Sequence, residues 1–186
     1  MPNFTKAAIK TSFIRLLDER PLKQITVKDI VEDCGINRNS FYYHFADIPT
    51  LIEEIIMDEA NRIIADNPKA DSVEQMLGIV MDFARSNKRA IMHIYKSVNR
   101  DVYEQYLWKV CEQAIRAYMD TLLEGHRISD TDKHVILRFY KCVCFGLVTE
   151  WMRCGMPQEA ETDMQRICEL KAGMVEEMIE RCEQQA

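Results

Sequence analysis

Residues 34–45, CGINRNSFYYHF, place hydrogen-bonding and aromatic side chains next to one another in one short segment. Arginine and asparagine form paired hydrogen bonds with the edges of DNA bases, and serine bonds to either donors or acceptors there. Tyrosine and histidine side chains reach phosphate oxygens. The segment therefore has the chemistry of a surface that reads a DNA groove, and the side chains that would do so are Arg38, Asn39, Ser40, Tyr42, Tyr43 and His44.

Helical spacing separates these side chains from the residues that must be buried. Phe41 and Phe45 lie one turn apart on one side of a helix, where Ile36 can join them as an anchor. The polar side chains cover most of the remaining surface. The alternative interpretation is an ordinary solvated helix, but such a face would more often carry Glu and Lys than two adjacent tyrosines.

The residues before this segment predict the elements that hold it. Apolar residues at i, i+4, i+7 and i+8 predict a first helix over about residues 4–18. Thr26 and Asp29 have the spacing of a capping box that begins a second, short helix, which Gly35 ends. Asn37 is placed to cap the third helix. Two short helices joined by a turn are typical of a helix-turn-helix, whose second helix enters the major groove.

The stretch ITVKDIVEDCGINRNSFYYHFADIPTLIEEI, residues 25–55, closely resembles the DNA-binding domain of the TetR (tetracycline repressor) family of bacterial transcriptional regulators. The resemblance covers the first 50 residues in full, whereas the rest of the chain matches only in architecture. It implies that bases face Arg38, Asn39, Ser40 and Tyr43. It also implies that phosphates contact Thr26, Lys28, Tyr42 and His44.

One position departs from the resembled pattern. Many members of the family carry a lysine where this chain has Ile48, and that lysine helps to hold a phosphate. Here the cap at Asp47 and the free amides of the following helix would have to take its place.

The net charge of −6 is unevenly divided along the chain. Residues 1–50 hold 7 basic and 6 acidic side chains, so only this part could approach a phosphate backbone, while the remainder carries a net −7. The sequence has no export signal and no apolar run of membrane-spanning length, which predicts a cytoplasmic protein without a membrane partner. The odd count of seven cysteines predicts reduced, mostly buried thiols.

The remainder of the chain predicts helices throughout and no strand alternation. We expect an all-α fold of about nine helices, divided into a helix-turn-helix domain over residues 1–47 and a larger helical effector and dimerisation domain over 48–186. The last two helices, about 130–154 and 158–183, are apolar over more than one packing seam requires. In the resembled family this pair builds a four-helix dimer interface, which implies a homodimer; packing within one chain is the alternative.

Aromatic and soft side chains gather in the middle helices, and most must form core. The resemblance nevertheless implies a small-molecule cavity between these helices, mostly apolar with a few polar tips. The effector-binding residues would then be Met81, His93, Tyr103, Trp108, Tyr140 and Trp151, with His93, Tyr103 and Tyr140 supplying the polar groups.

These features favour a ligand-responsive repressor that binds a pseudo-palindromic operator in double-stranded DNA as a homodimer and is released by a small-molecule effector. An activator of the same fold and a helical protein-interaction module without DNA binding are the alternatives. No catalytic motif is present, so an enzyme is disfavoured, and no cofactor is expected. Metal binding is disfavoured because Cys142 and Cys144 would lie about 200° apart on a helix.

Overall fold

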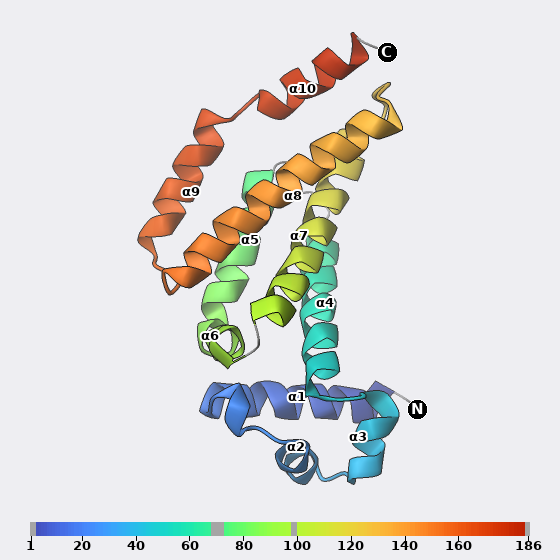
Figure 1. Ribbon diagram of the computed structural model, residues 1–186, viewed down its shortest axis with the longest axis vertical. Coiled ribbons are helices and arrows are strands. Elements are labelled where there is room, and N and C mark those ends of the chain that lie inside the picture. The colour runs from blue at the N-terminus through green and yellow to red at the C-terminus, as the bar shows by residue number, and fades with distance from the viewer. Residues whose placement is uncertain (1–2, 68–72, 98–99, 185–186) are drawn as a thin grey trace. The chain divides into compact units, whose positions relative to one another are not determined.

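The computed structural model describes residues 3–67, 73–97 and 100–184, and the all-α fold is confirmed over these ranges (Figure 1). The elements follow one another as α1 (Asn3–Glu19), η1 (Leu22–Gln24), α2 (Val27–Asp33), α3 (Arg38–His44), α4 (Ile48–Asp66), α5 (Val73–Ser86), α6 (Lys88–Ser97), α7 (Arg100–Leu122), α8 (Asp130–Arg153), α9 (Glu159–Leu170) and α10 (Met174–Glu183). η1 is a single turn of 3₁₀ helix.

The chain folds into two compact units that do not follow a single cut in the sequence. The first unit combines Met1–Asn61 with Ser86–Tyr106, and the second combines Arg62–Arg85 with Leu107–Ala186. Both α4 and α7 therefore begin in the first unit and end in the second. The functional division expected at residues 47 and 48 stays a prediction, because compactness alone does not say where DNA binding ends.

The core of the first unit is built by the apolar stripe of α1 against the three helices that follow. Ile9, Phe13 and Leu17 repeat at four-residue intervals, so they share one face of α1 and are buried together. Other members of this core come from α2, α3, α4 and the residues next to them, and include Ile30, Phe41, Phe45, Leu51 and Ile52; Ala90 of α6 and Tyr106 of α7 complete it. The Ser12 hydroxyl, also buried, donates a 3.2 Å hydrogen bond to the Ile30 carbonyl and so joins α1 to α2.

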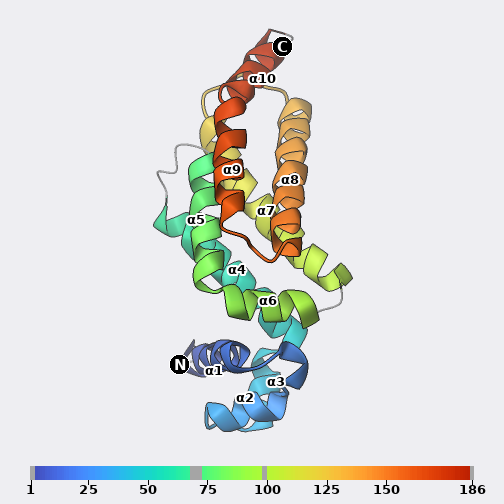
Figure 2. The ribbon, with the colours of Figure 1, turned by 90° about the vertical axis from the view of Figure 1, so that its left-hand side faces the viewer.

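The core of the second unit is formed by α7, α8 and α10. Its buried members include Ile115, Met119, Ile136, Tyr140 and Ile179. In Figure 2, α9 runs beside α8 in the opposite direction, and α10 continues beyond the end of α9.

The single last helix expected over about residues 158–183 is in fact two helices. The break falls between Leu170 and Met174, where Gly173 has a φ of +83°. Glycine adopts this left-handed conformation without the steric cost that other residues meet, which allows the chain to change direction there. The apolar periodicity continues through the break, so the sequence pattern did not reveal that the helix is interrupted.

The cysteines are less buried than expected. Among the described side chains, Cys111 and Cys144 are buried, Cys142 and Cys154 are exposed, and all are free thiols. Cys142 and Cys144 therefore lie on opposite sides of α8, as their spacing predicts.

Within the described residues no cluster of three or more His, Cys, Asp or Glu could hold a metal ion. None of the described helices combines the length and hydrophobicity that crossing a membrane requires.

Candidate nucleic-acid interface

The helix α3 is fixed at its start by Asn37 and along its inner side by phenylalanine rings. The Asn37 side-chain oxygen accepts hydrogen bonds from the Ser40 backbone N–H at 2.8 Å and from the Ser40 hydroxyl at 3.1 Å. Phe41 and Phe45 are fully buried, and their ring centroids lie 5.8 Å apart. The cap and the two rings together determine which face of this short helix remains outside.

That outside face carries Arg38, Asn39, Tyr42 and Tyr43, and we call it the reading face. All four are exposed, and Tyr43, with 82% of its surface accessible, is one of the most exposed large side chains of the protein. An exposed tyrosine hydroxyl needs no hydrogen-bond partner within the protein, so it remains available to a binding partner. The prediction that α3 presents polar groups outward therefore agrees with its geometry.

Two residues predicted for the same interface are less available. Ser40 is half-buried and its hydroxyl is already engaged with Asn37. His44 is also half-buried, and its ring packs edge-on against Tyr43 with centroids 5.0 Å apart. Their local role in shaping α3 is visible, whereas their DNA contacts stay a prediction.

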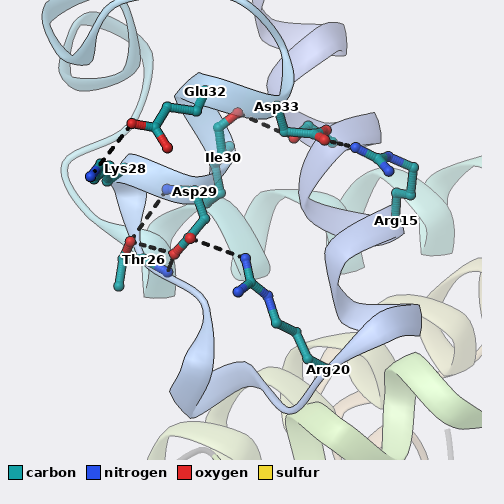
Figure 3. A network of polar contacts seen from close by, with 9 residues as sticks. Arg15, Arg20, Thr26, Lys28, Asp29, Ile30, Glu32 and Asp33 are labelled. Carbon is teal, nitrogen blue, oxygen red and sulfur yellow. Dashed lines mark hydrogen bonds and ion pairs between the residues drawn. The ribbon is translucent and has the colours of Figure 1, made fainter.

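The start of α2 is held by the capping box that the sequence predicts (Figure 3). The Asp29 backbone N–H donates to the Thr26 hydroxyl at 3.3 Å, and the Thr26 backbone N–H donates to the Asp29 carboxylate at 2.8 Å. The Thr26 hydroxyl also donates to that carboxylate. Lys28, on the exposed side of the same turn, lies 3.7 Å from Glu32.

The positive charge of the first unit is largely engaged by acidic neighbours. Arg15 forms ion pairs with Glu19 and Asp33, and Arg20 forms one with Asp29 at 3.1 Å (Figure 3). Over the described ranges, Lys23 and Arg38 take part in no ion pair. The charge available to phosphates is therefore smaller than the number of basic residues suggests.

The start of α4 carries the cap that the sequence predicts at Asp47. The Asp47 carboxylate accepts hydrogen bonds from the Thr50 backbone N–H at 2.8 Å and the Thr50 hydroxyl at 2.7 Å. These bonds lower the pKa of Asp47. The cap occupies the Thr50 amide, so phosphate binding here would depend on the remaining amides of the first turn.

Acid should weaken the capping box through Asp29. Bonds from the Thr26 hydroxyl and backbone N–H, with the Arg20 guanidinium, lower the pKa of Asp29 from 3.8 to about 2. A carboxyl group whose pKa is lower in the folded than in the unfolded protein stabilises the fold at pH values above its unfolded-state pKa. This stabilisation is lost as the pH falls toward its folded-state pKa. We expect the melting temperature of the Asp29→Asn variant to decline less steeply than that of the wild type between about pH 4 and pH 2, because the variant lacks the share of the decline that Asp29 contributes. Thermal unfolding across this range measures it; parallel curves for both proteins would contradict the assignment.

The six predicted effector-binding residues are divided between the two units. His93 and Tyr103 belong to the first unit, and Met81, Trp108, Tyr140 and Trp151 belong to the second. The His93 ring nitrogen Nδ1 lies 2.7 Å from the Leu17 carbonyl oxygen, and the Trp151 indole N–H donates to the Pro157 carbonyl at 3.1 Å. Both polar groups thus have partners within the chain. The effector-binding role of all six residues stays a prediction.

Trp108 lies beside a Lys–Glu ion pair. The Lys141 ammonium is 4.4 Å from the centroid of the Trp108 ring and 3.0 Å from the Glu112 carboxylate. Phe145 packs edge-on against the same indole at 5.2 Å. Lys141 and Glu112 were not among the predicted residues because a single Lys–Glu pair between two helices has no sequence signature.

Sequence reasoning also missed the contribution of α6 to the first unit. Arg89 and His93 of α6 contact the backbone carbonyls of Asp18 and Leu17 at the end of α1. Their four-residue spacing was visible, because it places both side chains on one face of a helix. Their partners are backbone atoms, which any residue type supplies, so nothing in the sequence pointed to α1.

Two protein-family models match the chain. The model described as bacterial regulatory proteins, tetR family, matches residues 14–55, which include α2 and α3. The model described as a transcriptional regulator C-terminal region of TetR type matches residues 71–172, more than half of the chain.

Curated relatives and solved structures agree with these matches. The regulator EthR of Mycobacterium tuberculosis is 27% identical over 130 residues, covering 64% of this chain and 60% of EthR, so the chain spans less than two thirds of that relative. The repressor KstR2 of the same species is 26% identical over 158 residues, covering 77% of this chain and 78% of KstR2.

The solved structure of DhaS, titled a dihydroxyacetone kinase operon activator, matches with a TM-score of 0.70 at 20% identity over 93% of this chain and 97% of DhaS. This likeness shows the same fold. Together with the two family matches over α2, α3 and the C-terminal helices, it leads to one conclusion: the chain belongs to the TetR family of bacterial transcriptional regulators, which are DNA-binding proteins and not enzymes.

Proposed function

We propose that the protein is a homodimeric, ligand-responsive repressor that binds a pseudo-palindromic operator in the cytoplasm and is released by a small-molecule effector. The observation that carries the DNA-binding part is the reading face, which is exposed while the opposite side of α3 is locked into the core by Phe41 and Phe45. In this proposal Arg38, Asn39 and Tyr43 contact base edges, and Lys28 and Tyr42 contact phosphates. Thr26, Ser40 and His44 complete the interface.

An apolar face in the second unit supports the homodimer. On α8, Val135 and Phe139 are 56% and 46% exposed although both are large and apolar. Leu170 at the end of α9 and Met174 at the start of α10 are exposed as well. Large exposed apolar side chains that are neighbours on a helix are typical of an interaction surface. A second copy would cover them and present two reading faces to half-sites about 34–36 Å apart or at a related spacing.

The names of relatives bear on the direction of regulation. KstR2 is named a repressor, which supports repression here. DhaS is titled an operon activator, so activation by the same fold is the second candidate. A reporter gene placed under the control of the protein's operator distinguishes repression from activation. Deleting the regulator raises expression if it is a repressor and lowers expression if it is an activator.

The operator can be identified by selecting double-stranded DNA from a random pool with the full chain. We expect the Arg38→Ala variant to bind the selected DNA about 5- to 150-fold more weakly and to discriminate less at one base position, as loss of a base contact does. We expect Lys28→Ala to weaken all sequences alike and to reduce the slope of log affinity against log salt by about 1.

Mobility shift over a range of salt concentrations measures both effects, and Lys133→Ala on α8 serves as a charge-matched control. A wild-type protein that selects no sequence would sink the proposal. An Arg38→Ala variant with unchanged affinity and sequence preference would contradict the assignment of α3 as the helix that reads the bases.

The effector is proposed to bind among the predicted side chains of the second unit, around Met81, Trp108, Tyr140 and Trp151. Both tryptophans of the protein belong to this unit. Quenching of their fluorescence by metabolites and drugs, followed by loss of the operator complex at the same concentration, tests this part. Binding that leaves the operator complex intact would argue against an effector role for the compound.

A further inference from the structure

The last turn of α1 lacks one of its own hydrogen-bond donors. In an α-helix the Leu17 carbonyl would accept from the backbone N–H of residue 21, but that residue is Pro21, which has none. The preceding bond of the helix is regular, since the Arg20 N–H donates to the Leu16 carbonyl at 3.0 Å. Helix ends expose such carbonyls, and when they are partly buried they need partners from elsewhere. The end of α1 therefore depends on a donor outside the helix.

Two side chains of α6 supply the missing donors. The Nδ1 atom of His93 lies 2.7 Å from the Leu17 carbonyl oxygen, and an Arg89 guanidinium nitrogen lies 3.3 Å from the Asp18 carbonyl oxygen. A carbonyl can only accept, so His93 must carry its proton on Nδ1 for this bond to form. Arg89 also places a positive charge at the negative end of the α1 dipole. We call these two residues the α1 clamp.

Packing holds the clamp against the helices that precede the reading face. α6 contacts both α1 and η1, the turn that leads into α2 (Figures 1 and 2). Ala90 of α6 is buried in the same core as Phe41, and Ile94 packs against that core. In the second turn of α7, the Tyr106 hydroxyl donates a 2.9 Å hydrogen bond to the Pro49 carbonyl in the first turn of α4.

Other contacts make α1 the element that connects these helices. Lys6 pairs with Glu54 of α4 at 2.8 Å, and Lys10 pairs with Asp58 at 2.5 Å. Ser12 and Arg15 bind α2. α1 is thus joined to α4 along its first half, to α2 in its second half and to α6 at its end. A shift of α6 at the end of α1 would move η1 and α2, and α3 with them, because one continuous core unites them.

We propose that Arg89 and His93 are positioning residues for DNA recognition: they fix the last turn of α1 and η1, and so set the orientation of the reading face without touching DNA. This inference rests on the proposed function, and it assigns α6 to the reading unit.

The test compares three substitutions on one helix. His93→Ala removes the donor, His93→Asn keeps an N–H near the position of Nδ1, and Lys96→Ala changes an exposed residue of α6 that has no part in the clamp. We expect His93→Ala to bind operator DNA selected by the wild type about five- to tenfold more weakly, the effect of one lost hydrogen bond. His93→Asn should restore affinity to within about twofold of the wild type, and Lys96→Ala should equal it.

A second readout needs no DNA. Backbone amide hydrogen exchange in the free protein should become faster in the last turn of α1, in η1 and in α2 of His93→Ala, and return toward the wild-type rate in His93→Asn. Arg89→Ala, at an exposed position that should not endanger folding, is expected to give the same pattern more weakly. Equal affinity and exchange in wild type and both alanine variants would overturn the inference.

Loss of affinity that His93→Asn fails to restore would also overturn it, because the ring's volume rather than its N–H would then be responsible. The exchange measurement separates the two proposals. A wild type that selects no DNA refutes the proposed function, while faster exchange in His93→Ala would still establish the clamp as a constraint on α2.

Discussion

Phe41→Ala is expected to lower the free energy of unfolding by about 3–5 kcal/mol and to abolish operator binding. Phe41 is 0% exposed and packs beside Phe45 in a core shared by α1, α2, α3 and α4. Removing the ring leaves a cavity that the surrounding helices cannot close without losing their arrangement. Because α3 has only seven residues, it has little stability of its own and depends on this packing.

Denaturation in urea, followed by circular dichroism, measures the loss of stability. The matched control is Tyr43→Ala, which also removes an aromatic ring from α3 but at a position that is 82% exposed. We expect Tyr43→Ala to change stability by less than about 0.5 kcal/mol and still to weaken operator binding. A Phe41→Ala protein as stable as the wild type would show that α3 is not held by this core.

Phe139→Glu is expected to convert the protein from dimer to monomer at micromolar concentration. The side chain is 46% exposed in the single chain and would be covered in the proposed homodimer. A glutamate there would have to lose water without gaining a partner, which costs several kcal/mol across a two-fold interface that contains it twice. Operator affinity should fall on the order of 100-fold or more, because a monomer reads one half-site.

Sedimentation equilibrium gives the mass, and circular dichroism should show unchanged helix content. Phe4→Glu is the control for mass, since it makes the same chemical change at an 87% exposed phenylalanine of α1. A Phe139→Glu protein that remains dimeric would place the interface elsewhere.

The fold could be predicted from the sequence wherever local signals and burial agreed. The capping box of Thr26 and Asp29, the cap at Asn37 and the apolar stripe of α1 all lie within a few residues of the structure they form. The break near Gly173 could not be predicted, because apolar residues continue on both sides and one glycine within a helical pattern is often tolerated.

The residue types of the candidate interface could be predicted from the sequence. The number of its basic side chains that remain outside ion pairs could not. Counting the basic side chains of residues 1–50 includes Arg15 and Arg20, which the structure pairs with Asp33 and Asp29. Such pairs connect separate segments of the chain, so only the folded arrangement reveals them. The same reason hid the role of His93, whose partner is a backbone atom more than 70 residues away.

The alternation of the two compact units along the chain has a consequence for protein engineering. Residues 62–85 are inserted between the two stretches that make up the first unit, and residues 86–106 are inserted between the two stretches of the second. A fragment truncated after α4 would retain the helix-turn-helix but leave the carbonyls of Leu17 and Asp18 without their α6 donors. Chimeras that exchange effector specificity between related regulators therefore need three junctions, at about residues 61, 85 and 106, rather than one.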